Sequence, residues 1–167
     1  MKKIVALSLI LLLVISCIGC SKEAPDYQRP LNCYYLSKTI QYNTSNAVIG
    51  CEQVEGAMLV NESLGQFLRQ YLKGPDSKDL VSPFPAGTFL VHLAIDNDTV
   101  KVRLSNEFSI LTGHDLTLAC ACITLTILDY TGLSYVSISV EGASLNDKMT
   151  LTLSRDDLIF LDPAANY

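Results

Sequence analysis

The sequence predicts an α+β domain in which a small mixed or antiparallel sheet carries two helices on one face and is preceded by a β-hairpin. Three observations predict this class: β-prone segments separated by turn sequences, one strongly amphipathic helical segment, and one apolar segment too long for an ordinary strand. After the hairpin, the expected order is helix, strand, strand, helix, strand. Two helices with apolar sides pack most economically on one face of such a sheet. We expect a single domain over residues 31–163.

The first two predicted strands cover residues 31–37 and 47–54, which are aromatic or β-branched in character. Between them, the residues Asn43–Asn46 supply turn chemistry, because asparagine and serine side chains bond readily to nearby backbone. The two segments therefore predict a β-hairpin, which we expect to be centred on Tyr42.

An amphipathic helix is predicted over residues 64–72, where apolar residues recur at i, i+3, i+4, i+7 and i+8. Ser63 and Gln66 have the spacing of a capping box at its start. Gly74 and Pro75 end it, because glycine accepts the left-handed cap and proline cannot continue a helix.

A rigid connector, Pro83–Gly87, leads into two further predicted strands at residues 88–95 and 99–104. The polar turn Asp96–Asp98 joins these strands. Their alternating pattern and the tight turn between them predict an antiparallel pair in the main sheet.

The segment 115–129 is ambiguous, because its threonines favour a strand while its apolar residues also fall at helical spacing. Its length favours a buried helix, which ends at Thr131 and Gly132. Residues 135–140 alternate as a half-buried strand, and short strands are expected at 149–153 and 158–161.

The first residues have the pattern of a bacterial lipoprotein signal peptide, which we place at residues 1–19. Lys2 and Lys3 precede a long apolar run that is too short to span a bilayer comfortably. The run ends at two cysteines, and either Cys17 or Cys20 could be the lipidated residue that follows cleavage. The alternatives are a plain transmembrane anchor or soluble secretion.

Residues 20–30 are polar, contain two prolines, and predict a flexible tether between the membrane and the domain. Full lipoprotein modification, palmitate included, would hold the protein at the extracytoplasmic face of the cell membrane, because one acyl chain alone anchors weakly.

Composition excludes two classes of protein. The chain has 167 residues, of which 49% are hydrophobic and 17% are charged, so it is not an intrinsically disordered chain. Its formal net charge of −5 disfavours a nucleic-acid partner, which would require a basic surface.

Four cysteines follow the tether, and two of them suggest a disulfide. In a hairpin centred on Tyr42, Cys33 and Cys51 face each other within disulfide reach. The alternative is that both are buried, reduced thiols. Cys120 and Cys122 are too close in sequence to bridge each other on a helix.

Neither a metal site nor a catalytic site is predicted, and no cofactor is expected. The cysteines lack the paired spacing of a zinc site, and His92 and His114 fall in a predicted strand and a polar turn. No serine lies in a nucleophile-elbow motif. We interpret Ser105 and Glu107 as structural, because such side chains satisfy backbone groups where a strand ends.

In order and spacing, several segments make the chain similar to the GerMN domain family, named for the spore germination and sporulation protein GerM. These segments are Tyr34–Leu36, Lys73–Pro75, Pro85–Thr88, Val102–Phe108 and Val136–Gly142. The resemblance implies a fold like the ring-building modules of secretion and sporulation complexes. It also implies a membrane-tethered, non-catalytic domain with a role in sporulation or germination. The family protein has two such domains in tandem, whereas this chain has room for one.

The expected function is therefore that of an extracytoplasmic lipoprotein whose domain binds a protein partner in a complex at the cell envelope. An envelope domain that binds a small ligand or a glycan is the alternative, and a hydrolase is a more distant one. The segment after Gly142 lies outside the resemblance.

Overall fold

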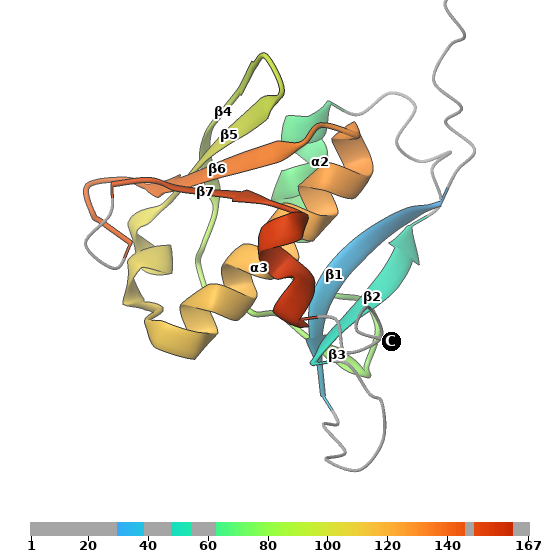
Figure 1. Cartoon of the computed structure of the whole chain (residues 1–167). Helices are drawn as coiled ribbons and strands as arrows, with labels where there is room; N and C mark the ends of the chain where they lie inside the picture. Colours follow the sequence, from blue (N-terminus) through green and yellow to red (C-terminus); the bar gives the residue numbers. More distant parts are fainter. Residues whose placement is uncertain (1–29, 39–47, 55–62, 146–148, 162–167) are drawn as a thin grey trace, which may run out of the picture.

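The computed structural model describes residues 30–38, 48–54, 63–145 and 149–161, to which the structural statements below refer (Figure 1). The expected signal peptide, most of the tether, and the candidate lipidation residues Cys17 and Cys20 lie outside these ranges. No helix in the described part of the chain has both the length and the apolar character needed to cross a membrane.

The first sheet has three antiparallel strands in the order β2-β1-β3. Strands β1 (Leu31–Ser37) and β2 (Ile49–Val54) form the predicted hairpin pair. The two-residue strand β3 (Leu80–Val81), which the sequence analysis did not predict, pairs with the end of β1.

The second sheet has four strands in the order β4-β5-β6-β7. They are β4 (Leu90–Asp96), β5 (Thr99–Leu104), β6 (Tyr135–Val140) and β7 (Leu151–Ser154). Only β5 and β6 are parallel to each other, so the sheet is mixed, as expected. The long connection between these parallel strands contains the second helix.

Two α-helices cover the inner face of the four-stranded sheet (Figure 1). Helix α2 (Leu64–Tyr71) contacts β4, while α3 (Gly113–Thr131) contacts both β6 and β1. The helix α3 therefore lies between the two sheets. This position explains why α3 carries buried side chains on almost all of its sides. The α+β class with two helices on one face is confirmed, and the ambiguous segment is a buried helix.

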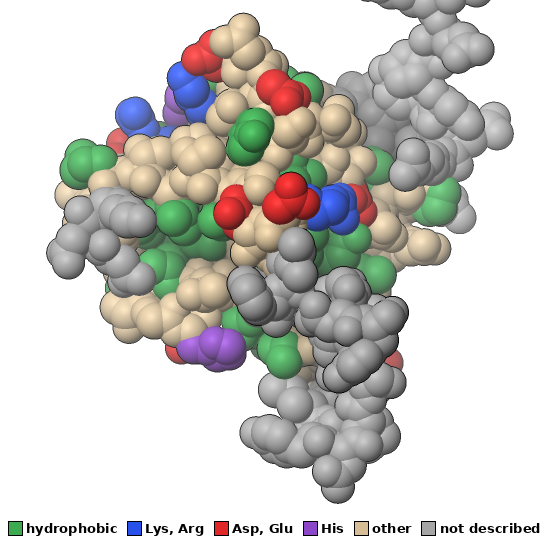
Figure 2. Space-filling view, viewed as in Figure 1, with side chains coloured by type: hydrophobic (Ala, Val, Ile, Leu, Met, Phe, Trp, Pro, Cys, Tyr) green, Lys and Arg blue, Asp and Glu red, His purple; other side chains and the backbone are tan. Residues whose placement is uncertain are grey.

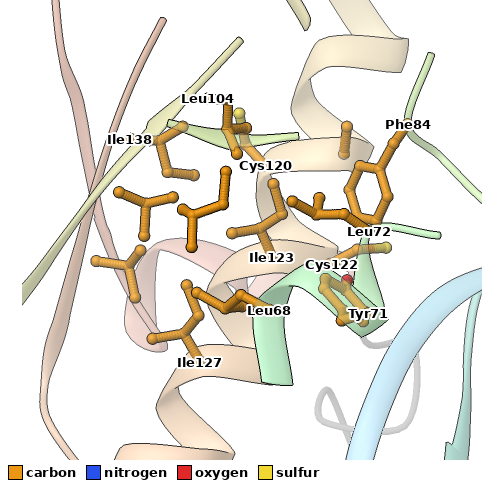
Figure 3. Packing of buried hydrophobic residues seen from close by; sticks show 14 of the residues in the cluster. Leu68, Tyr71, Leu72, Phe84, Leu104, Cys120, Cys122, Ile123, Ile127 and Ile138 are labelled. Carbon is orange, nitrogen blue, oxygen red and sulfur yellow. The ribbon is translucent and has the colours of Figure 1, made fainter. Parts of the chain in front are cut away.

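The core lies where α2 and α3 meet the four-stranded sheet (Figure 3). In this view Leu68 of α2 and Ile127 of α3 lie close to each other, and Ile138 of β6 lies at the upper left of the same cluster. All three side chains are at most 2% exposed. The burial of such side chains is the main force that holds the helices on the sheet.

Local sequence signals explain the helix ends. The capping box is confirmed, since the Ser63 side chain accepts from the Gln66 backbone N–H and the Gln66 side chain accepts from the Ser63 backbone N–H. At the end of α3, Gly132 has a φ of 69°, which glycine adopts without steric cost.

The strand expected at 158–161 is wrong, because this segment belongs to the 3-10 helix η3 (Asp156–Leu161). Here Asp157 accepts from both the backbone N–H and the hydroxyl of Ser154, which turns the chain out of β7. A second short 3-10 helix, η2 (Asn106–Ile110), follows β5.

Candidate functional site

The hairpin register differs by one residue from the expected one, and this corrects the pairing on which the disulfide was predicted. Cys33 lies opposite Glu52, and Cys51 lies opposite Tyr34. A slip of one residue places two side chains on opposite faces of a sheet. Accordingly Cys33 is 2% exposed whereas Cys51 is exposed, and both are free thiols in the structure.

The buried thiols are poor nucleophiles. Burial, followed by the charges of Glu52 and Cys51, raises the pKa of Cys33 to about 12. Burial also raises the pKa of Cys120 and of Cys122 to about 12. Since the thiolate is the reactive form, these three residues do not form a catalytic centre at neutral pH.

Histidines and acidic residues are dispersed. Among the described residues, no three His, Cys, Asp or Glu side chains lie close enough together to hold a metal ion. His92 is exposed on β4 opposite Arg103 of β5. On the face shown in Figure 2, basic side chains gather at the upper left. The sequence suggested that His114 lies in a polar turn. In the structure, His114 lies in the first turn of α3.

The structure supports the structural interpretation of Ser105 and Glu107. The Ser105 hydroxyl accepts a hydrogen bond from the backbone N–H of Phe89 at 3.0 Å. The hydrogen bond between Ser105 and the exposed Glu107 carboxylate, together with one from the backbone of Glu107, lowers the pKa of Glu107. These bonds fix the connector that precedes β4.

A groove of about 670 Å³ lies between α2 and the connector that leads to β4, and we call it the α2 groove. One wall comes from the end of α2 and the other from the connector. Its lining residues are Arg69, Leu72, Lys73, Ser82, Phe84, Pro85, Ala86, Gly87, Thr88, Phe89 and Leu90. The lining thus combines aromatic and aliphatic surface with two cationic side chains.

The charge of the α2 groove is positive, although the chain as a whole is acidic. Arg69 lies in the last turn of α2 and Lys73 lies just beyond the end of the helix, and both line the groove. The Lys73 ammonium donates to Gln70 at 2.7 Å, and within the described ranges neither cation forms an ion pair. Glu107 lies beside the opposite end of the groove, near Gly87.

The two residues between the connector and β4 have side chains in unusual environments. Thr88 is only 8% exposed and its side-chain oxygen is buried. Within the described part of the chain, this oxygen has no hydrogen-bond partner. The next residue, Phe89, is 55% exposed despite its large apolar ring. A buried unpaired hydroxyl and an exposed aromatic ring both cost free energy in the unbound protein.

A second cleft, of about 430 Å³, lies between the hairpin and α2 and is lined in part by Cys33, Tyr35 and Glu52. The Glu52 carboxylate already accepts from the backbone N–H groups of Asp76 and Ser77, at 3.3 and 3.0 Å. Glu52 therefore holds the loop after α2, and Lys73 and Asp76 also line this cleft.

The edge of the four-stranded sheet lies directly beside the α2 groove. Strand β4 pairs only with β5 among the described strands, so one side of its backbone lacks a strand partner there. Phe89 and Leu90 line the groove and lead into this strand. An unpaired edge next to an apolar groove is an arrangement that can accept an extended peptide.

Sequence reasoning did not find the α2 groove. The connector and the helix were both predicted, but nothing local in the sequence indicates that Phe89 and Arg69 line the same cavity. The proline-rich stretch before a strand was the one available signal, because rigid connectors on the surface often carry binding residues.

Taken together, the two sheets and the helix enclosed between them define an α+β module with a groove at the end of α2. The profile of the Germane family, described as sporulation and spore germination, matches residues 32–146. The chain therefore belongs to the Germane family.

Solved structures agree on the fold. The first GerMN domain of the sporulation protein GerM from Bacillus subtilis is similar, with a TM-score of 0.55 and 19% identity over 77% of this chain and 99% of that chain. The tandem GerMN domains of the same protein match equally well, but only 47% of that chain is covered. A Clostridium perfringens protein assigned as a lipoprotein has a TM-score of 0.50 and 22% identity, over 86% of this chain and 99% of that one. No curated protein sequence matches the chain.

Proposed function

We propose that this protein is a lipid-anchored, extracytoplasmic lipoprotein whose Germane domain binds a protein partner at the cell envelope, without catalysis, during sporulation or germination. The observation that carries the proposal is the exposed ring of Phe89, which lies at the α2 groove and next to the edge of β4 that has no partner among the described strands. Aromatic side chains of this kind are enriched in protein interfaces.

The other groups in the described part of the chain fit a binding module better than an enzyme. Its buried thiols are protonated at neutral pH, and its two histidines lie on different elements. The hydroxyl of Ser105 and the carboxylate of Glu107 are engaged in holding the connector. A groove that meets a strand edge offers a surface for recognition and no group for bond cleavage.

Anchoring is supported by the leader sequence with its cysteines at positions 17 and 20. Metabolic labelling with an alkyne analogue of palmitate is expected to label the wild-type protein. One of the two variants Cys17→Ser and Cys20→Ser should lose the label and accumulate as the uncleaved precursor, while the other should keep it. The anchor would be contradicted if both variants were labelled. It would also be contradicted if the wild-type protein and both variants all remained unlabelled.

Partner binding is tested by site-specific photo-crosslinking in intact cells, with benzoylphenylalanine placed at Phe89, at Ile110 or at Met149. All three side chains are exposed, so each tolerates the probe, but only Phe89 lies at the groove. We expect one discrete adduct from position 89 in vegetative or sporulating cells. The absence of a discrete adduct from every position would contradict a stable protein partner.

A further inference from the structure

We infer that the α2 groove recognises an extended, acidic segment of the partner, in which a carboxylate stands next to a large apolar side chain. This inference rests on the proposed function and specifies the chemistry of the partner. The occupant is a peptide segment that pairs with β4 and continues across the groove.

The charge of the groove favours an acidic occupant. Its lining contains Arg69 and Lys73 but no Asp or Glu, on a chain with a formal charge of −5. Each cation attracts a carboxylate placed in the groove, and salt weakens this attraction because the groove is open to solvent. The carboxylate belongs at the α2 wall, because Glu107 occupies the neighbourhood of Gly87 at the other end.

The remaining surface of the groove favours an apolar side chain next to that carboxylate. Leu72, Phe84 and Phe89 contribute aliphatic and aromatic walls, and the volume of about 670 Å³ is large enough for one or two side chains. Burying a large apolar side chain there, and covering the exposed ring of Phe89, supplies the hydrophobic part of the affinity.

Thr88 provides an independent indication that the groove is incomplete without a ligand. Its hydroxyl is buried in the wall and lacks a hydrogen-bond partner in the described part of the chain. A rotation of the Thr88 side chain toward the groove would let a carboxylate or backbone carbonyl of the bound segment accept this hydrogen bond, because the oxygen is enclosed in the unbound protein. Buried hydroxyls are otherwise nearly always paired.

The position of β4 indicates that the occupant is an extended peptide and not a compact small molecule. Phe89 and Leu90 line the groove and continue directly into the strand, whose outer edge has no partner among the described strands. A peptide added to this edge would make main-chain hydrogen bonds along β4 and then carry its next side chains into the groove.

The test uses the full chain as isolated from cell envelopes and reconstituted in nanodiscs. The probe is a fluorescein-labelled short peptide with a central leucine-phenylalanine pair between runs of aspartate, and the same peptide with asparagine in place of aspartate is the matched ligand. Fluorescence anisotropy is expected to show saturable binding of the aspartate peptide that weakens with salt. The asparagine peptide should bind about tenfold more weakly.

Matched variants locate the binding. Arg69→Gln and Lys73→Gln should each weaken binding of the aspartate peptide by about tenfold, because a hydrogen bond to a charged group is lost. Arg103→Gln removes the same charge from the outer face of the sheet, where Arg103 is exposed, and should leave the affinity unchanged. Glu107→Gln should leave it unchanged or strengthen it.

The hydroxyl is tested by a second pair of variants. Thr88→Val removes the unpaired hydroxyl of the groove, and Thr124→Val removes an unpaired buried hydroxyl inside α3. Only the first should weaken binding, by about three- to tenfold.

Equal affinity of the two peptides, an equal loss with Arg103→Gln, or no binding of the aspartate peptide would overturn the acidic-segment inference. The proposed function would survive those results if photo-crosslinking from Ile110 or Met149 still gave a discrete adduct. The loss of adducts from all positions would instead contradict the proposed function itself.

Discussion

Tyr35 and Tyr71 hold the hairpin and the end of helix α2 together through reciprocal contacts. The Tyr35 hydroxyl donates to the backbone carbonyl of Tyr71 at 2.9 Å, and the Tyr71 hydroxyl donates to the backbone carbonyl of Tyr34 at 2.7 Å. Their ring centroids are 4.9 Å apart. This pair fixes the end of α2, and so it also positions Lys73 at the edge of the groove.

Removing either hydroxyl should destabilise the domain. Tyr71→Phe and Tyr35→Phe each remove one hydrogen bond made by a buried tyrosine ring, so we expect a loss of about 1 kcal/mol in the free energy of unfolding. Urea denaturation followed by circular dichroism measures this loss. Tyr135→Phe serves as the control, because Tyr135 is 46% exposed on the outer face of β6. A control loss as large as the other two would refute the role of the pair.

Asp129 should contribute more to stability than an exposed acidic residue. It accepts from Asn32 at 3.1 Å and from the Tyr34 hydroxyl at 2.8 Å, and it pairs with Arg155 near the C-terminal segment. We expect Asp129→Ala to cost about 1 to 3 kcal/mol. Asp96→Ala removes the exposed pair with Lys101 and an exposed hydrogen bond from Asn97, and should cost at most about 0.5 kcal/mol.

Thermal and urea unfolding of both aspartate variants measure the difference. Hydrogen exchange adds a local readout, since amides of η3 should exchange faster in Asp129→Ala than in Asp96→Ala. Equal stability of the two variants would show that the network around Asp129 adds nothing beyond a surface pair.

The cysteines should differ strongly in accessibility. Cys51 is an exposed thiol, whereas Cys33, Cys120 and Cys122 are buried and have pKa values raised to about 12 by burial. Iodoacetamide at neutral pH should therefore modify Cys51 in the folded protein and the other three only after denaturation. Peptide mapping by mass spectrometry identifies the sites, and an unmodified Cys51 linked to Cys33 would restore the disulfide predicted from the sequence.

The domain should lose stability in alkaline solution. Each buried thiol keeps its proton to a higher pH when folded, because its pKa rises from the usual 9.0 to about 12, and burial and Asp129 raise the pKa of Tyr34 to about 12. A raised pKa in the folded state means that the unfolded chain loses protons first. The stabilisation is thus complete below about pH 9 and declines as the pH rises toward 12.

Urea titrations between pH 8 and pH 11, on the order of one per half unit, follow this decline. Tyr34→Phe removes one of the titrating groups and should make the decline shallower above the usual phenol pKa of 10.0. A free energy of unfolding that stays constant or rises over this range would contradict the assignment.

Those parts of the fold that depend on neighbouring residues were predictable. Ser63 and Gln66 indicated the start of α2, and the length of the segment around Ile123 favoured a helix over a strand. The structural role of Ser105 followed from its place at the end of a strand. In each of these cases the deciding contacts lie within a few residues of one another or follow from segment length.

The remaining features depend on contacts between distant segments. Strand β3 consists of Leu80 and Val81 and exists only because β1 offers them partners. The hairpin register could not be settled from its turn residues, and the slip of one residue separated Cys33 from Cys51. The α2 groove likewise requires the packing of two segments whose closeness leaves no periodic signal.

The position of α3 between the two sheets sets an order of events during synthesis of the chain. The backbone N–H of Tyr34 in β1 donates to the side chain of Thr126, a residue made 92 positions later. The N-terminal hairpin emerges from the ribosome long before the helix that completes its core. Because such distant contacts form slowly, the first strands have no stable packing partner until nearly the whole domain has been made.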